Sequence, residues 1–235
     1  MTERDNVRPE GKWEFNAEVT TCFANMLERS IPDYRSMRSL VCEVGQQFVK
    51  PDTMVIDIGC STGLAVEPLI VAHGQHNKFL LIDNAPAMVE ACRKHYAGRE
   101  DFVKVEQGNP WDFLPLSGQP ASLVQSILSL QFMPTTYRQK IITDIYESLA
   151  PGGAFIFVEK IISENQDELM VQLYYEMKRQ NGYTEDQIQS KRKALENVLS
   201  PLKAEWNVDM LRTAGFVKVD MFWRCLNFCG WIAVK

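Results

Sequence analysis

The sequence has few histidines, which are the commonest metal ligands in proteins. Its 235 residues include three histidines, and none of them lies in a cysteine-rich stretch. The six cysteines show no paired C-x-x-C spacing, which excludes the usual zinc patterns. We therefore expect no bound metal, and we expect reduced, buried thiols of the kind found in cytoplasmic proteins.

Long apolar runs and an excess of positive charge are also missing. No apolar stretch approaches the roughly 18 residues of a membrane span, so none is expected. The chain has 25 basic and 30 acidic residues, for a formal net charge of −5. This balance excludes a general attraction to nucleic acid or to anionic membranes and favours a small-molecule substrate. The length suits a single domain covering residues 1–235.

The stretch from Met54 to Gly63 is the most informative part of the chain. An apolar segment, typical of a buried parallel strand, leads into a turn containing Gly59 and Gly63. A second apolar run ends at Asp83. A glycine turn after one strand lets a ligand approach the backbone, and an acid at the end of the next strand accepts from ribose hydroxyls. The pattern predicts a nucleoside site, although Asp83 also suits the start of a helix.

The spacing inside the turn favours S-adenosylmethionine over a dinucleotide. In the dinucleotide fingerprint G-x-G-x-x-G, the middle glycine admits a pyrophosphate. Here Ser61 occupies that position, and Asp57 precedes the turn. An acid at this place repels a diphosphate but suits a ligand with an ammonium or sulfonium group. S-adenosylmethionine has both cations and no phosphate.

Strand and helix patterns alternate along most of the chain. They predict an α/β fold with a doubly wound, mostly parallel, seven-stranded sheet that follows two N-terminal helices at residues 18–28 and 34–48. The strands are expected near residues 54–58, 79–82, 103–105, 121–130, 154–158, 216–223 and 225–234, the last two forming an antiparallel hairpin. A polar helical insertion at residues 163–200, divided at Asn181-Gly182-Tyr183, is expected to act as a lid or a dimer interface.

The order of predicted strands and helices and the glycine turn resemble those of class I S-adenosylmethionine-dependent methyltransferases, whose fold is Rossmann-like. Nearly the whole chain is similar to the carboxy-S-adenosylmethionine synthases, through seven motifs: Gly11-Lys12-Trp13-x-Phe15, Arg29-Ser30-Ile31-Pro32-x-Tyr34, Asp57-Ile58-Gly59-Cys60-Ser61, Ile82-Asp83-Asn84-x-Pro86-Ala87-Met88, Lys178-Arg179-x-Asn181-Gly182-Tyr183, Lys191-Arg192-x-x-Leu195-Glu196-Asn197-Val198 and Leu226-Asn227-Phe228.

The resemblance implies a reaction and an assembly. These synthases convert S-adenosylmethionine and prephenate into carboxy-S-adenosylmethionine and phenylpyruvate. Prephenate loses carbon dioxide and aromatises, and a sulfonium ylide traps the carbon dioxide. The product is the carboxymethyl donor for modification of a tRNA wobble uridine. The resemblance also implies a homodimer, in the cytoplasm, whose ligand is S-adenosylmethionine or its carboxylated product.

The same resemblance assigns roles to individual residues. Arg192 would clamp the transferred carboxylate, for which a planar guanidinium is well suited. In a basic run such as Lys191-Arg192-Lys193, however, it is also typical of a solvated helix face. The expected donor site comprises Tyr34, Asp57, Gly59, Cys60, Ser61, Gly63, Asp83, Asn84, Asn109, Pro110 and Ile127.

Three of these positions depart from the family pattern. Asn109 and Pro110 stand where the family has aspartate and isoleucine, and Ile127 stands where it has asparagine. An amide can still accept from the adenine amino group, but Ile127 cannot form a hydrogen bond. These departures leave open a divergent methyltransferase acting on a small molecule. A non-catalytic nucleoside-binding module, with residues 163–200 as its interface, is the third hypothesis.

Overall fold

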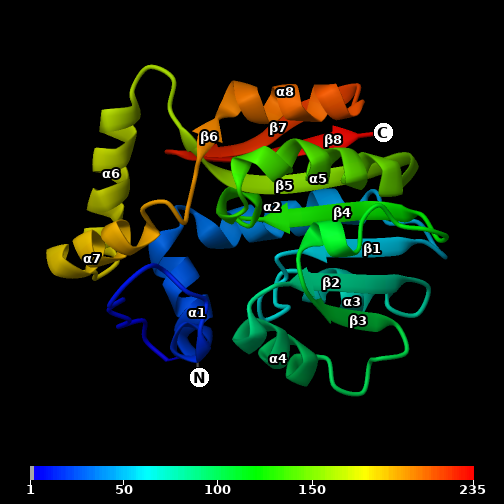
Figure 1. The fold of residues 1–235 in the computed structure, drawn as a ribbon, viewed down its shortest axis with the longest axis horizontal. Coiled ribbons are helices and arrows are strands. Elements are labelled where there is room, and N and C mark those ends of the chain that lie inside the picture. The colour runs from blue at the N-terminus through cyan, green and yellow to red at the C-terminus, as the bar shows by residue number, and fades with distance from the viewer. Residues whose placement is uncertain (1–2) are drawn as a thin grey trace.

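An eight-stranded sheet forms the centre of the molecule in the computed structural model, which describes residues 3–235 (Figure 1). Five parallel strands stand in the order β3-β2-β1-β4-β5; β8 then pairs antiparallel with β5, and β7 pairs antiparallel with β8 at the edge. Their bounds are β1 Met54–Ile58, β2 Lys78–Asp83, β3 Val103–Gln107, β4 Ala121–Ile127, β5 Leu149–Ile162, β6 Leu202–Lys203, β7 Lys218–Cys225 and β8 Phe228–Val234. The predicted doubly wound sheet and terminal hairpin are confirmed.

The strand count exceeds the predicted seven because of β6. This strand has two residues, Leu202 and Lys203, and pairs with the end of β5. Two residues cannot show an alternating pattern, so the sequence carried no signal for it. The predicted strand at residues 121–130 is shorter than expected, since Leu128 has a φ of 58° and breaks the extended conformation after Ile127.

Helices cover both faces of the sheet. One face packs on α2, α3 and α4, and the other on α5 and α8. The helices are α1 Ala17–Ser30, α2 Tyr34–Gln46, α3 Glu67–His73, α4 Pro86–His95, α5 Thr135–Ser148, α6 Asp167–Gln180, α7 Glu185–Leu195 and α8 Ala204–Ala214, with 3-10 turns η1 Pro110–Asp112 and η2 Leu130–Phe132. The sequence predicts a helix from about Leu64 to His73, but α3 begins at Glu67, because residues 59–66 form the glycine turn.

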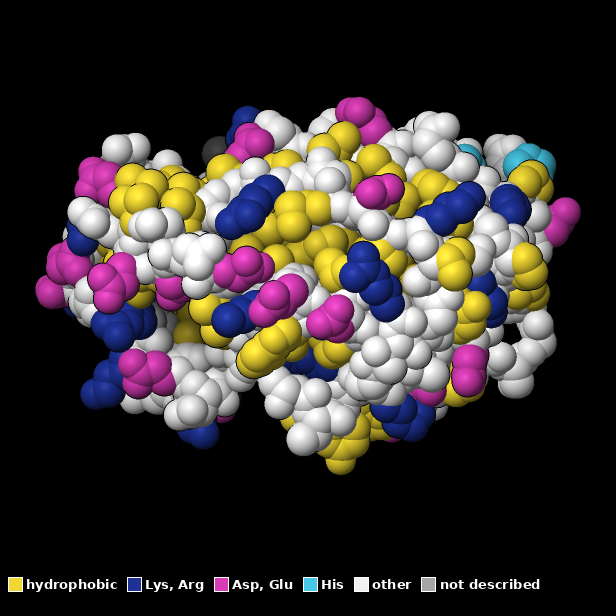
Figure 2. Space-filling view, turned by 90° about the horizontal axis from the view of Figure 1, so that it is seen from above, with side chains coloured by type: hydrophobic (Ala, Val, Ile, Leu, Met, Phe, Trp, Pro, Cys, Tyr) yellow, Lys and Arg dark blue, Asp and Glu magenta, His cyan; other side chains and the backbone are white. Residues whose placement is uncertain are grey.

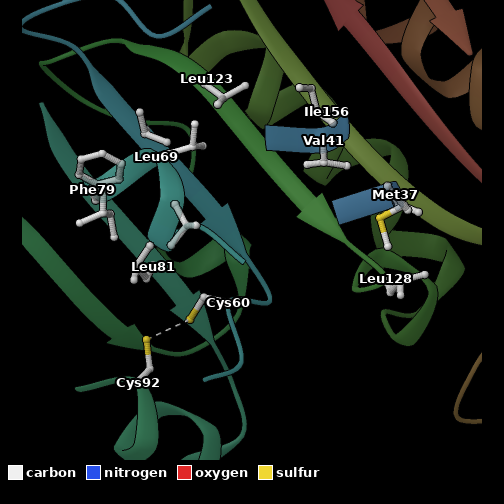
Figure 3. Close-up of a cluster of buried hydrophobic side chains, with 14 of the residues drawn as sticks. Met37, Val41, Cys60, Leu69, Phe79, Leu81, Cys92, Leu123, Leu128 and Ile156 are labelled. Atoms are coloured by element: carbon white, nitrogen blue, oxygen red, sulfur yellow. Dashed lines mark hydrogen bonds between the residues drawn. The ribbon is translucent and has the colours of Figure 1, made fainter. Parts of the chain in front are cut away.

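Alternation along the strands divides the core between the two faces. In β1, Val55 belongs to the cluster under α2 and α3, whereas Ile56 and Ile58 belong to the cluster under α5. Figure 3 shows the first cluster, where Phe79 and Leu81 of β2 point toward Leu69 of α3. Successive side chains of a strand point to opposite faces, so a continuous apolar run is what a strand buried on both faces requires.

The helical insertion lies at the end of the sheet where the parallel strands finish. Figure 1 shows α1, α6 and α7 together at this end. The predicted division at Asn181-Gly182-Tyr183 is confirmed: Gly182 has a φ of 83°, and Thr184 then begins α7 with a capping box to Gln187. Arg29 of α1 ties the parts together by donating to the carbonyls of Asn181 and Gly182.

The surface mixes charges of both signs. Figure 2 shows acidic and basic side chains interspersed with apolar ones over one face of the molecule. Leu169 and Leu173 of α6, both 43% exposed, are among the larger apolar side chains that the fold leaves uncovered. Within residues 3–235, no helix has the length and apolar character that crossing a membrane demands.

Candidate functional site

A cavity opens at the carboxyl ends of the parallel strands, as the strand order predicts. In the sheet, β1 lies between β2 on one side and β4 on the other. The strand order reverses at this point, which creates a crevice at the carboxyl ends of the strands. The glycine turn, the ends of β2 and β4, and helices α1, α2, α6 and α7 supply the cavity wall. Nine predicted donor-site residues lie on it: Tyr34, Gly59, Cys60, Ser61, Asp83, Asn84, Asn109, Pro110 and Ile127.

Backbone geometry explains why glycine stands at position 59. Gly59 has a φ of 74°, and a Cβ there would lie 1.9 Å from Oγ of Ser129. The N–H groups of Gly59 and Cys60 donate to the carbonyl of Ile82, at 2.8 and 3.1 Å. The turn is thereby fastened to the end of β2 while its other side faces the cavity.

Gly63 and Asp57 are not part of the cavity wall. A Cβ on Gly63 would lie 2.5 Å from the ring of Tyr96, whose hydroxyl donates to the Gly63 carbonyl at 2.7 Å. Gly63 therefore allows the turn to pack on α4. Asp57 is buried beneath the turn, and burial raises its pKa to about 7. Both residues support the site from below.

Asp83 holds the turn and the next helix together. Its Oδ2 accepts from the N–H of Ser61 at 2.8 Å, and its Oδ1 accepts from the N–H of Ala85 at 2.9 Å. Burial raises the pKa of Asp83, and the hydrogen bonds from the backbone of Ala85 and Ser61 work against that rise. Each carboxylate oxygen can accept a further hydrogen bond, so the two ribose hydroxyls of a nucleoside can be bound as well.

Asn84 and Asn109 form the neighbouring part of the wall. Nδ2 of Asn84 donates to Oδ1 of Asn109 at 3.1 Å. Asn109 also begins η1, and its N–H donates to Oδ2 of Asp112 at 2.8 Å. Pro110 is the first residue of that turn, a position where its missing N–H costs nothing. The amide of Asn109 thus keeps the place that an aspartate would occupy in the family.

Three lysines contribute cations to the other side of the cavity. Lys160 extends from β5, Lys178 from α6 and Lys191 from α7. Lys191 is paired with the buried carboxylate of Asp5, which also accepts from Tyr183. Burial works against ionisation of Asp5, but the hydrogen bonds from Lys191 and Tyr183 hold its pKa below the usual value.

Arg192 lies outside this wall. Its side chain is exposed on α7, whereas the adjacent Lys191 points inward, because successive helix residues are rotated by about 100°. The structure therefore does not bring Arg192 together with the other predicted residues within one chain. The motif Lys178-Arg179-x-Asn181-Gly182-Tyr183 and the dipeptide Glu159-Lys160 were visible signals for the lysines that sequence reasoning passed over.

The cavity fits S-adenosylmethionine. Its wall offers the carboxylate of Asp83 and the amides of Asn84 and Asn109 as hydrogen-bonding groups, together with apolar side chains such as Met88 and Phe132. Within residues 3–235 no group of three or more histidine, cysteine, aspartate or glutamate side chains could hold a metal ion.

Comparison with known proteins identifies the family. A methyltransferase domain model matches residues 55–153, from β1 to β5. The carboxy-S-adenosyl-L-methionine synthase of Methylococcus capsulatus is 39% identical over 224 residues, which is 94% of this chain and 93% of that protein. The synthase of Salmonella paratyphi C is 35% identical over 96% of this chain and 92% of its own. The chain belongs to the carboxy-S-adenosyl-L-methionine synthase family.

Membership makes the protein an S-adenosylmethionine-dependent transferase. The divergent methyltransferase is the less favoured reading, because the likeness to the synthases extends over nearly the full length of both chains.

Solved structures confirm the fold of this carboxy-S-adenosyl-L-methionine synthase family member. An O-methyltransferase family protein from Burkholderia thailandensis matches with a TM-score of 0.63 at 18% identity, covering 94% of this chain and 60% of that one. Human N-acetylserotonin methyltransferase, solved with S-adenosylmethionine, matches with a TM-score of 0.59 at 14% identity, covering 93% and 55%. The central sheet is thus the Rossmann-like methyltransferase sheet.

Proposed function

We propose that the protein converts S-adenosylmethionine and prephenate into carboxy-S-adenosylmethionine and phenylpyruvate. The observation that carries this proposal is a single cavity with a nucleoside-type wall at Asp83 and a cationic wall at Lys160, Lys178 and Lys191. A methyltransferase with a neutral acceptor has no need of buried cations, whereas a dicarboxylate substrate requires them. The full-length likeness to named synthases supports the same reaction.

The reaction balances without a further reactant. Prephenate breaks its bond to the ring carboxylate and loses hydroxide, which leaves phenylpyruvate. The methyl carbon of S-adenosylmethionine gives up one proton and gains the carboxylate. The proton and the hydroxide form water. The work left to the protein is to hold two substrates side by side and to keep bulk water away from the released carbon dioxide.

Each part of the cavity receives a role in this proposal. Asp83 and Asn84 bind ribose, Asn109 with Pro110 borders the adenine, and the backbone of residues 59–61 forms the floor. Tyr34 and Ile127 flank the reacting end. Helices α6 and α7 act as the cover, and the whole chain serves as one domain.

We still assign Arg192 the role of binding the transferred carboxylate, although its side chain must first reach the cavity. An exposed side chain on α7 reaches that carboxylate only if α7 moves or if a second copy presents it, which agrees with the proposed homodimer. Arg192→Ala should leave affinity for S-adenosylmethionine within about twofold and weaken the carboxylated product at least 10-fold, the value of a lost charged hydrogen bond. Equal weakening of both ligands would make Arg192 structural. Titration calorimetry with the two nucleosides measures the difference.

The wider proposal is a cytoplasmic enzyme whose product serves tRNA wobble-uridine modification, with no direct contact to the tRNA. The decisive experiment is mass spectrometry of nucleosides after incubation of the purified protein with S-adenosylmethionine and prephenate. A product heavier by one carbon dioxide supports the proposal. Formation of S-adenosylhomocysteine alone, with an added acceptor, contradicts it.

A further inference from the structure

Two lysines of the cavity wall have no partner of opposite charge. Lys160 is half-buried at the end of β5, and Lys178 on α6 is 5% exposed. Among residues 3–235, neither ammonium forms an ion pair or a hydrogen bond with a protein acceptor, while Lys191 beside them is paired with Asp5. Two cations therefore border the cavity without neutralisation.

Aromatic rings hold these two ammonium groups near each other. Nζ of Lys160 lies 4.7 Å from the ring centroid of Tyr174, and Nζ of Lys178 lies 5.5 Å from the same centroid. Lys178 is also 5.1 Å from the ring of Tyr183. A ring face stabilises a cation without cancelling its charge. Burial raises the pKa of Tyr174, so this phenol stays neutral and supplies no anion.

Asp5 and Asp167 do not neutralise the charges of these two lysines. Asp5 is taken by Lys191 and Tyr183. Asp167, whose charge acts on Lys160, accepts from the N–H of Ser163 at 2.8 Å. Burial, together with the charges of Lys191 and Lys160, lowers the pKa of Lys178 to about 8. A fold that buries cations together in this way gains stability when an anion binds between them.

We propose that Lys160 and Lys178 form the receptor for the carboxylates of the second substrate, a dianion with an unsaturated ring. The inference rests on the proposed function and names the residues that recognise its substrate. Phe228 and Tyr174, with ring centroids 5.5 Å apart, offer an apolar surface for the ring.

The location of the receptor agrees with this use. Asp83 ends β2, and Lys160 lies near the end of β5. These strands are three places apart in the sheet, which corresponds to about 14 Å. The donor bound at β2 can therefore extend along the strand ends and place its sulfonium between the ribose site and the two lysines.

The test is substrate kinetics in Lys160→Met and Lys178→Met. Each variant should raise KM for prephenate at least 10-fold, change kcat less than threefold, and leave KM for S-adenosylmethionine within about twofold. Lys178→Arg should recover most of the prephenate affinity because it restores the charge. Lys193→Met is the matched control, since Lys193 is exposed on α7 away from the cavity. Melting temperatures no lower than that of the wild type verify that each variant is folded.

A binding measurement separates failure of this inference from failure of the proposed function. The protein is loaded with S-adenosylhomocysteine, which cannot react, and titrated with prephenate or with malonate as a plain dicarboxylate. If the wild type makes no carboxy-S-adenosylmethionine but binds malonate only with both lysines present, the reaction is wrong and the receptor stands. If the wild type makes the product and the lysine variants behave like Lys193→Met, the receptor is overturned. Absence of lysine-dependent binding of both dicarboxylates also overturns it.

Discussion

The two ends of the cavity are built in different ways. At the donor end, Asp83 and the glycine turn are fastened by backbone hydrogen bonds between adjoining strand ends. At the cationic end, long side chains from β5, α6 and α7 meet around two tyrosine rings. The donor end is therefore rigid and locally encoded, whereas the cationic end depends on packing of an insertion. The difference suits a shared donor and a substrate particular to one family.

The largest expected effect lies at the donor end. Asp83→Ala removes the acceptor proposed for two ribose hydroxyls and leaves the Ser61 and Ala85 N–H groups without their carboxylate partner. Charged hydrogen bonds contribute about 1.5–3 kcal/mol each, so affinity for S-adenosylmethionine should fall by about 3–6 kcal/mol. Calorimetric titration measures this fall. The exposed Asp101 at the opposite end of the sheet provides the control, Asp101→Ala. Affinity retained in Asp83→Ala would remove the ribose assignment and break the comparison.

At the cationic end, the substitution with the largest expected effect lowers the free energy of unfolding. Lys191→Met leaves the fully buried Asp5 without its counter-charge. Removing one partner of a buried ion pair typically costs about 3–5 kcal/mol. Urea unfolding should show this decrease for Lys191→Met and almost none for Lys193→Met. If both variants unfold alike, the pairing of Lys191 contributes nothing to the fold.

Glu159, next to Lys160 in the chain, makes the stability of the fold depend on pH. It is buried beneath the site, and burial raises its pKa to about 8, although Arg138 works against the rise. The folded protein keeps this proton while the unfolded chain loses it near the ordinary value of 4.5. The contribution of Glu159 to stability is thus present at low pH and lost as pH rises from about 4.5 to about 8, by about 1.4 kcal/mol per pH unit.

Glu159→Gln tests this linkage. Urea unfolding at several pH values should show the variant gaining on the wild type as pH rises through that window. A constant difference between the two proteins at all pH values would mean that Glu159 is already ionised when folded.

The smallest effect is expected where the chain departs from its family. Ile127 lies on the cavity wall at the end of β4. Ile127→Asn would restore a polar contact and should tighten S-adenosylmethionine by about 0.5–1.5 kcal/mol, the net value of a hydrogen bond. Ile127→Val, which stays apolar, is the matched variant. Tightening in Ile127→Val as well would show that size, and not polarity, decides at this position.

Much of the fold was predictable because its signals are local. The apolar strands, the turn at Gly59 and the hairpin that ends the sheet are each encoded within one short continuous segment, and the structure confirms them. The two-residue β6 and the start of α3 at Glu67 were missed. Short pairings and the first turn of a helix depend on contacts that a periodic pattern does not contain.

The candidate site shows the same difference between features encoded locally and features that depend on tertiary packing. Nine of the eleven predicted donor residues reach the cavity, while Asp57 and Gly63 support it from beneath. A turn between two strands has little freedom in where it places its residues. The side chain of a helix residue, in contrast, points inward or outward according to how the helix docks, and this decided between Lys191 and Arg192.

By itself, the sequence determined the nucleoside-binding half of this protein, because strand periodicity, glycine conformation and the position of Asp83 are properties of short segments. Only the tertiary structure decided the cationic half. Lys160, Lys178 and Lys191 lie up to 31 positions apart in the chain, and they meet only because α6 and α7 fold back over the ends of the strands. The packing of an insertion leaves no local pattern in the sequence, because the free energy that stabilises it comes from contacts between residues far apart in the chain.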